Sequence, residues 1–579
     1  MTHSDAPTTE FAWTALGGDP ALVPRLSTVV RSGALEARLP VRELARACVG
    51  ACALAAAELG ARRAGLVDVP EVRVDDGAVA TAFVSERHLL VDGRAPVTFA
   101  PLSRFWRTAD GWVRTHANYP HHRARLLGAL GLPDDASVEA VAGCLAERPS
   151  VEVESAVYAA GGLAVALRTP EEWARHEQGA AVAGQPLVER GRLGSAVPRR
   201  LPPLAGDPLL PAAGLRVLDL TRVIAGPVAT RTLALLGADV LRVDPPGLPE
   251  LADQHTDTGF GKRSATLDLT AGRHDRQVFE ELLASADVVV TGYRPGALDR
   301  FGLSAEALAE RRTGIVVGQL SAWGAYGPWG GRRGFDSLVQ VATGIAALER
   351  SREKPGALPA QALDHGTGYL LAAGVLRAVT EGLNEGGTRF VRPTLARTAT
   401  WLMGGAEWGG ATGDACGSGG ATGDVSGSGG STADAFGPRG VTADTSGPRG
   451  VTADASGPGG AMADALGPRE ATADASGLRE GSHGGSGLRG VTADTSGPGE
   501  GSYGGSRSSE GSHGGSGSPV YSDSRSAGAS YGDPAPWLAE ADSVLGRLRY
   551  ALPPVSFVGG PGDWSRPPGR WGADSPRWG

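Results

Sequence analysis

A single carboxylate stands at the start of an apolar, helix-forming run in residues 359–371, PAQALDHGTGYLL. This residue, Asp364, precedes a His-Gly-Thr-Gly stretch, and residues 369–379 extend the apolar run. Proteins use carboxylates as acids, bases and nucleophiles. An Asp here also fits a helix N-cap, because its side chain can accept hydrogen bonds from the unpaired N–H groups of the first helical turn. The spacing leaves both interpretations open, and the neighbouring segments must decide between them.

Several cations fall in glycine-rich loops that follow apolar segments. Because Arg and Lys donate charge-assisted hydrogen bonds to phosphate oxygens, such loops suit a ligand that bears phosphates. For any one of these side chains, a solvated surface position is an equally good interpretation. The six cations are Lys262, Arg263, Arg294, Arg300, Arg332 and Arg333.

Histidines and cysteines give no metal signal. His116, His121 and His122 have no carboxylate or cysteine at ligand spacing beside them, so we expect solvated or hydrogen-bonding side chains there. The cysteines show no C-x-x-C pair, which argues against a zinc site and against a disulfide framework. Cys48 and Cys52 lie one helical turn apart in an Ala-rich segment and are expected to be small buried hydrophobes.

The elements that must position Asp364 are expected to be alternating strands and helices. A strand at 215–220, a helix at 226–237 and a strand at 238–243 would require parallel pairing with a crossover. The loop after the first strand, TRVIAGP, lacks the three glycines of a dinucleotide site, so no nicotinamide cofactor is expected. The loops of such an open sheet line the crevice where ligands bind. The further expected elements are a helix at 279–286 and strands at 287–291 and 315–320.

Composition narrows the class of protein. The 579 residues carry a net charge of −8 with both signs interspersed, which gives no support to nucleic-acid binding. The N-terminal residues lack a basic segment followed by an apolar one, and we expect no window with the roughly 18 apolar residues of a membrane span. The sequence therefore predicts a cytoplasmic protein that does not contact a membrane.

Four regions follow from the changes in composition. A Gly-, Ser- and Thr-rich decapeptide repeat begins after Leu402, and none of its positions is regularly large and apolar. A solenoid would have no core, so we expect disorder there. The tail regains six aromatic residues and is expected to dock as an extended strap. The regions are 1–200, helical and α+β with a Pro/Arg-rich linker at 186–211; 201–403, the α/β domain; 404–535, the disordered insert; and 536–579, the strap.

A set of segments in the region 214–402 points to a known family. They are residues 215–243, GKRSATLDL at 261–269, 287–303, Gly334-Phe335-Asp336 with Gln340 and Gly344, and Asp364 with Gly368. In this order and at these intervals they resemble the class III CoA-transferases (CaiB/BaiF type), the family of formyl-CoA, carnitine and bile-acid CoA transferases. Segments 108–112 and 168–173 resemble the family's small-domain portion, which usually follows the catalytic Asp. The chain therefore looks permuted, or fused from partial copies.

The resemblance implies a fold, a reaction and a site. The fold would be α/β, an open Rossmann-like parallel sheet with a smaller α+β domain. Asp364 would be the nucleophile that moves CoA from an acyl-CoA thioester to a free carboxylic acid, through a mixed anhydride and an enzyme-CoA thioester. CoA would be a substrate, with no tightly bound cofactor and no metal, and the protein would be a homodimer. The residues implied for CoA binding are Val223, Ile224 and Ala225 near the adenine, Lys262, Arg294 and Arg300 near the phosphates or channel, and Tyr293 near the pantetheine or adenosine.

Two alternatives come from other classes of function. Related α-methylacyl-CoA racemases have a Gly-His-Asp triplet, whereas this sequence has Gly334-Phe335-Asp336, and phenylalanine carries no proton. His365 is a poor substitute, because neighbours in sequence point in different directions from Asp364. The second alternative is a non-catalytic acyl-CoA-binding paralogue, because residues 78–97 show no counterpart of the family's closing glycine loop.

Overall fold

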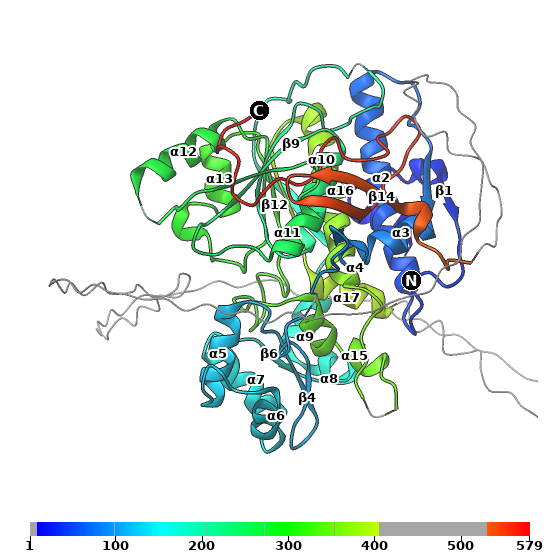
Figure 1. The fold of residues 1–579 in the computed structure, drawn as a ribbon. Coiled ribbons are helices and arrows are strands. Elements are labelled where there is room, and N and C mark those ends of the chain that lie inside the picture. Colours follow the sequence, from blue (N-terminus) through cyan, green and yellow to red (C-terminus); the bar gives the residue numbers. More distant parts are fainter. Residues whose placement is uncertain (1–7, 98, 205, 271, 353, 405–529) are drawn as a thin grey trace, which may run out of the picture. The chain divides into compact units, whose positions relative to one another are not determined.

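The computed structural model describes residues 8–97, 99–204, 206–270, 272–352, 354–404 and 530–579 (Figure 1). The expected disordered insert at 404–535 lies almost entirely outside these residues.

One large sheet organises the described part of the chain. It is mixed, with six neighbouring strands parallel and one edge strand antiparallel. Its order is β10-β9-β8-β11-β12-β13-β7. The expected α/β class with a large sheet is confirmed. The strands are β7 (Val188–Gly194), β8 (Arg216–Leu220), β9 (Asp239–Asp244), β10 (Arg263–Thr266), β11 (Val288–Thr291), β12 (Val316–Gln319) and β13 (Thr388–Pro393).

The edge strand β7 corrects one expectation. Residues 186–211 were expected to be a linker, yet Val188 to Gly194 pair with β13. The cause is a pattern that sequence reasoning undervalues: a polar, Arg-rich strand is stable at a sheet edge, where only one neighbour is needed and side chains stay partly exposed.

Alternate residues of the central strands face two separate cores. Val288 and Val290 of β11 join the core that contains the helices α10 (Ala225–Leu235) and α16 (Ala362–Glu385). Val289 joins the opposite core, with α12 (Arg273–Ala284) and α13 (Ala305–Arg311) (Figure 1). Helices on both faces explain why β11 is apolar at every position and not at every second one.

The helix α2 (Val41–Ala64) packs along α16. It corrects the expectation that no segment is long and apolar enough to span a membrane, because α2 meets both criteria. In this structure, 89% of its most apolar window is buried inside the protein. An Ala-rich helix buried on nearly all sides needs no polar face, which accounts for the composition. Cys48 and Cys52 are buried in it, as expected.

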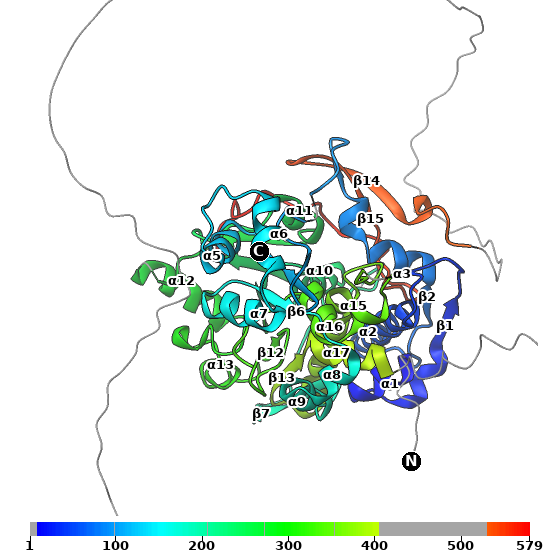
Figure 2. The same cartoon turned by 90° about the horizontal axis from the view of Figure 1, so that it is seen from below.

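A smaller α+β unit lies beside the sheet. Three antiparallel strands, β4 (Phe105–Arg107), β5 (Trp112–Thr115) and β6 (Ala164–Ala166), form its sheet. The helices α5 (Pro120–Leu130), α6 (Val138–Ala146) and α7 (Ser150–Ala159) pack on it around a core of their own (Figure 2). We call residues 102–168 the small module.

The remaining described elements surround these layers. In the tail, β14 (Leu538–Ser543) pairs with β15 (Gly546–Ala551), and β15 pairs with β3 (Leu90–Val91). Ala573 bridges to Ala265 in β10. The other elements are α1 (Thr9–Ala15), η1 (Pro20–Arg25), β1 (Leu26–Val29), β2 (Val72–Asp75), α3 (Asp76–Ala82), α4 (Ser85–His88), α8 (Pro170–Arg175), α9 (Glu177–Ala183), α11 (Ala252–Thr258), η2 (Asp299–Phe301), α14 (Asp336–Ala342), α15 (Ile345–Leu348), α17 (Leu395–Gly404) and η4 (Ala535–Trp537).

Candidate active site

Asp364 is the third residue of α16, and it is not the helix cap. The backbone N–H groups of Leu363 and Asp364 both donate to Oδ2 of Asp336, at 2.9 and 3.0 Å. Asp336 therefore satisfies the start of the helix in place of an ordinary N-cap. The capping interpretation of Asp364 is wrong, and its own carboxyl group remains available for chemistry.

Asp336 is held firmly in its role as acceptor. It is fully buried at the first residue of α14, and its Oδ1 accepts a hydrogen bond from the amide of Gln340. The Gln340 Oε1 accepts in turn from the Leu358 backbone N–H at 2.9 Å. These contacts fix the backbone at the start of α16 and, with it, the position from which the Asp364 side chain extends.

The two carboxyl groups resist ionisation. Burial raises the pKa of Asp336 to about 6, although the N–H groups that it accepts act in the opposite direction. Burial raises the pKa of Asp364 well above its usual range, and the charges of Asp336 and Glu86 add to this rise. Asp364 is 6% exposed, so it is nearly enclosed. Because the two carboxyl groups are neighbours and are buried away from water, the ionisation of both is energetically unfavourable.

A third carboxylate, Glu86 of α4, belongs to the same group. Its Oε2 lies 3.8 Å from Nε2 of His365, and His365 packs on Phe83 with ring centroids 5.3 Å apart. Burial opposes ionisation of Glu86, but the contact with His365 outweighs it and lowers the pKa of the carboxyl. Glu86 lies in residues 78–97, where no closing glycine loop was found. No local pattern marks it, because only tertiary packing brings α4 to α16.

The loop of Val223, Ile224 and Ala225 lies against the Asp364 helix. A Cβ added to Gly368 would lie 2.5 Å from the carbonyl oxygen of Ala225, so the start of α10 approaches α16 as closely as a glycine allows. Val223 has a φ of +73°, a left-handed conformation that is strained for a β-branched residue. The structure thus brings this predicted loop to Asp364.

Two of the three predicted residues after β11 lie near this loop. A Cβ added to Gly292 would be 3.4 Å from Thr221, so the loops that leave β8 and β11 are neighbours where the strand order reverses. Burial raises the pKa of Tyr293 to about 12 and the charge of Arg222 opposes the rise, which places Tyr293 near that cation. Arg294 is half-buried in the same loop. Arg300 is exposed and packs on Phe301, 4.7 Å from the ring centroid, and no described contact joins it to the others.

Lys262 does not fit its predicted contact with a phosphate. It is 3% exposed, and its Nζ donates to Asp219 at 3.0 Å, to the Pro227 carbonyl at 2.9 Å and to Thr230 at 2.6 Å. All three of its donors are therefore used inside the protein. A GKR sequence in a loop does not reveal whether the lysine side chain points toward a ligand or toward the core. Here the Lys262 side chain points inward and neutralises the buried Asp219.

Two of the three histidines of the small module, His116 and His122, are buried, whereas solvated or hydrogen-bonding side chains were expected. His116 stacks on Phe335 with centroids 3.7 Å apart, and His122 packs edge-on to the same ring at 5.8 Å. Burial lowers the pKa of His116 to about 3 and that of His122 to about 2, so both rings are neutral at pH 7. Neither Nδ1 atom has a hydrogen-bond partner among the described residues. No group of three metal-ligating side chains occurs in this part of the chain.

The comparison with protein families agrees with this geometry. Residues 212–428 match CoA-transferase family III. We refer to these matched residues as the CoA-transferase family III region. Asp336, Asp364, Gly368 and the Val223 loop all lie inside the CoA-transferase family III region, whereas Glu86 and His116 come from outside it.

Curated relatives align with the CoA-transferase family III region. An acetyl-coenzyme A transferase, nodX, from Hypoxylon pulicicidum is 34% identical over 209 residues, which is 35% of each chain. The probable fatty acyl-CoA transferase Rv3272 from Mycobacterium tuberculosis is 33% identical over 211 residues, 34% of this chain and 53% of the relative. A formyl-CoA:oxalate CoA-transferase from Rhodopseudomonas palustris is 33% identical over 186 residues, 30% and 43%. The chain therefore spans about a third to a half of the length of these relatives.

Solved structures were also found. The crystal structure of Rv3272 is 34% identical and covers 33% of this chain and 57% of its own, with a TM-score of 0.31. A CaiB/BaiF family protein from Brucella suis is 28% identical and covers 32% and 54%, also with a TM-score of 0.31.

Proposed function

We propose that the protein is a CoA transferase that moves CoA between an acyl-CoA thioester and a free carboxylic acid. The observation that carries this proposal is Asp364: a nearly enclosed carboxyl group at the start of a buried helix, relieved of capping by Asp336. It lies at the position that the family resemblance gives to the nucleophile. The relatives named as acyl-CoA and formyl-CoA transferases support the same class of reaction.

The proposed chemistry proceeds in balanced steps. The Asp364 carboxylate attacks the thioester carbonyl carbon, and the CoA thiolate leaves, which forms a mixed anhydride. The thiolate then attacks the Asp364 carbonyl, releasing the donor acid as a carboxylate and leaving an aspartyl-CoA thioester. The acceptor carboxylate then attacks the aspartyl-CoA thioester, which releases the CoA thiolate and forms a second anhydride. The thiolate attacks the acceptor carbonyl of this anhydride, which gives the new acyl-CoA and restores the Asp364 carboxylate. Asp364 must be ionised to start, and a carboxylate whose pKa is raised is the stronger nucleophile once its proton has left.

The finer assignments are part of the proposal. We place CoA at the carboxyl edge of the sheet, between the Val223–Ala225 loop and the loop of Tyr293 and Arg294, with Arg300 at its outer end. We treat the sheet as Rossmann-like, since its six parallel strands follow the chain order 3-2-1-4-5-6 of such folds. A homodimer of twice 59.0 kDa and a cytoplasmic location complete the assignment.

Intact-protein mass spectrometry tests the nucleophile. Incubation with a panel of acyl-CoAs should give a CoA-sized adduct on the wild type, and hydroxylamine should convert it to a hydroxamate at Asp364. Both products should vanish in Asp364→Ala. Glu43→Ala is the matched control, because Glu43 is also the third residue of a 24-residue buried helix and should leave the adduct intact. An adduct that survives Asp364→Ala would disprove the assignment.

One observation favours a second candidate, an α-methylacyl-CoA racemase-like enzyme. Phe335 replaces the histidine that such enzymes need, but the neutral ring of His116 stacks on Phe335 and comes from another part of the chain. A neutral imidazole has a nitrogen that can accept an α-proton, and a protonated carboxyl group can return one. Deuterium incorporation at the acyl α-carbon, lost in His116→Ala and without any CoA adduct, would favour this candidate. Acyl-CoA binding with neither product would indicate the non-catalytic paralogue.

A further inference from the structure

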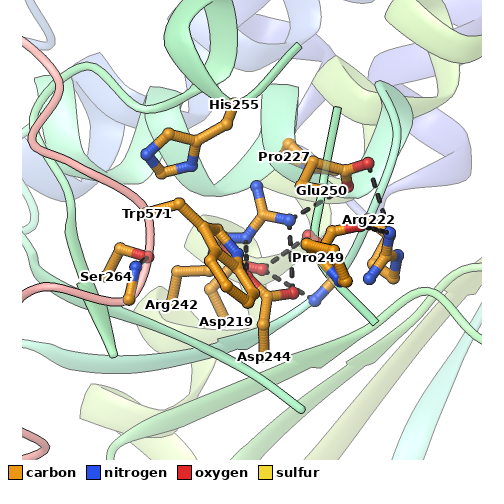
Figure 3. Close-up of polar contacts among 12 residues, drawn as sticks. Asp219, Arg222, Pro227, Arg242, Asp244, Pro249, Glu250, His255, Ser264 and Trp571 are labelled. Carbon is orange, nitrogen blue, oxygen red and sulfur yellow. Dashed lines mark hydrogen bonds and ion pairs between the residues drawn. The ribbon is translucent and has the colours of Figure 1, made fainter. Parts of the chain in front are cut away.

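Glu250 is a buried carboxylate on which several separate parts of the structure converge. It lies between β9 and α11, and its side chain has no exposed surface. Its Oε2 accepts from the Val223 backbone N–H at 3.1 Å and from Arg242 at 3.0 Å. Its Oε1 accepts from the Tyr119 hydroxyl at 2.5 Å and from Arg222 at 3.3 Å. Figure 3 shows Glu250 between the two arginines.

The Tyr119 contact reaches across from the small module. Tyr119 immediately precedes α5 and is 4% exposed, and Arg222 lies over its ring, 5.4 Å from the centroid. Three residues earlier, His116 packs on Phe335. The segment 116–119 is therefore fixed at two points, one beside Asp336 and one at Glu250.

The Val223 contact acts on strained backbone. A β-branched residue rarely adopts φ near +73°, so the conformation persists only because its surroundings hold it. The bond from the Val223 N–H to Glu250 is one of those constraints. Two residues later, the Ala225 carbonyl meets Gly368, one helical turn after Asp364. A shift of this turn would thus reach the Asp364 helix directly.

The charges around Glu250 balance only when it is ionised. Burial opposes its ionisation, but the charges of Arg222 and Arg242 outweigh burial and lower the pKa of the carboxyl. Arg242 is shared with Asp244 through bonds of 2.7 and 3.2 Å. Removing the Glu250 charge would leave Arg222 without its only described carboxylate partner.

We propose that Glu250 is a positioning residue that couples the seating of the small module, through Tyr119, to the strained turn at Val223 beside the Asp364 helix. This proposal rests on the proposed function in one respect only, namely that the Val223 turn borders the CoA site. When Tyr119 is seated, the Glu250 oxygens are fixed and the turn is held. When it is not, the turn relaxes and CoA loses part of its binding surface.

Hydrogen exchange on the full chain tests the link without any assay of activity. Tyr119→Phe keeps the ring and the Glu250 charge but removes the hydroxyl, and amide exchange in residues 221–226 should become about tenfold faster. Tyr158→Phe is the matched control. It removes another hydroxyl of the small module, one that donates to the Arg333 carbonyl, and should leave exchange in 221–226 unchanged. Unchanged exchange in Tyr119→Phe would overturn the proposal.

Kinetics with an acyl-CoA donor then tests the consequence. Tyr119→Phe should raise KM about tenfold with kcat nearly retained, because the reacting carboxylate is untouched. Glu250→Gln should do the same or more, and the double variant should be no worse than Glu250→Gln alone, since both act through one link. Fully additive effects would contradict the coupling. If Asp364 forms no adduct but the exchange result holds, the proposed function fails and the link stands. If Glu250→Gln does not fold, Tyr119→Phe still decides.

Discussion

At the scale of single residues, the burial of the Asp336 and Asp364 carboxyl groups makes the stability of the protein depend on pH. Burial favours the protonated forms of both acids, so the folded state retains protons that the unfolded chain releases near pH 4. Stability from this source is complete below the unfolded pKa, falls as pH rises above that value, and is lost once pH exceeds the folded pKa, which is about 6 for Asp336.

We therefore predict that Asp364→Asn stabilises the protein at neutral pH. A neutral isostere has no proton to lose, so the free energy of unfolding of the variant should exceed that of the wild type at pH 7.5 and match it below pH 4. Urea unfolding at several pH values measures this difference. Glu43→Gln is the control, because Glu43 is partly exposed and paired with Arg42, and it should follow the wild type throughout. A difference that does not grow with pH would contradict the explanation.

The sequence singled out Asp364, whose carboxyl group the structure nearly encloses, and it misjudged the surroundings of Lys262. Asp364 could be singled out because residues 366–368 and the upstream Asp336 lie along the chain at the intervals on which the family resemblance rests. Lys262 was misjudged because a loop sequence does not reveal whether a side chain turns toward ligand or core. Glu86 carried no signal, and His116 was considered only as a metal ligand, since both reach the site only through packing between distant segments.

At the scale of elements, the close contact between α10 and α16 lies next to the site. Gly368→Ala would place a methyl group 2.5 Å from the Ala225 carbonyl oxygen, so the helices must separate. We expect a loss of about 1–3 kcal/mol in the free energy of unfolding and at least a tenfold loss of the proposed transferase activity. Chemical denaturation and the adduct assay measure the two effects.

The same helix supplies the matched control for this variant. A Cβ on Gly382 would meet nothing within 4 Å, so Gly382→Ala should stabilise α16 by about 0.5–1 kcal/mol and leave the adduct unchanged. If both variants behaved alike, helix propensity and not the close approach to Ala225 would explain Gly368.

The strands were predictable where both of their faces are buried. The valines of β11 and β12 form apolar runs that only a covered sheet explains, and the expected strands at 287–291 and 315–320 fall there. The edge strand β7 was missed, since its polar residues resemble a linker. The Ala-rich segment of Cys48 and Cys52 suits a helix, but the burial of α2 against α16 depends on a partner more than 300 residues away and cannot be derived locally.

At the scale of the whole molecule, the sequence left two explanations for the unusual order of segments, permutation or fusion of partial copies. α2 and α16 have the same length, 24 residues, and nearly the same N-cap angles, −75° and 59° against −75° and 62°. Each ends at a glycine with positive φ and is followed by a short strand and a short helix. These matches favour partial copies, with Glu43 at the place in α2 that Asp364 holds in α16.

The tail binds these parts to the sheet, and its removal should show how much it contributes. Trp564, Trp571 and Trp578 donate hydrogen bonds to the Arg231 carbonyl, the Asp244 carboxylate and the Leu282 carbonyl, at 2.9, 2.9 and 3.1 Å. Deleting residues 562–579 removes these bonds and uncovers the Arg242–Asp244 pair, and we expect a loss of several kcal/mol.

A single substitution in the tail should lower the free energy of unfolding by less than the deletion does. Trp571→Phe keeps most of the packing and should cost only about 1 kcal/mol, because Asp244 retains Arg242 as its partner. Urea unfolding distinguishes the two variants: the deletion should lower both the midpoint and the m-value, since less surface is buried on folding, whereas Trp571→Phe should lower the midpoint alone. An unchanged midpoint in the deletion would mean that the tail does not dock in solution, and Asp244 would then depend on Arg242 alone.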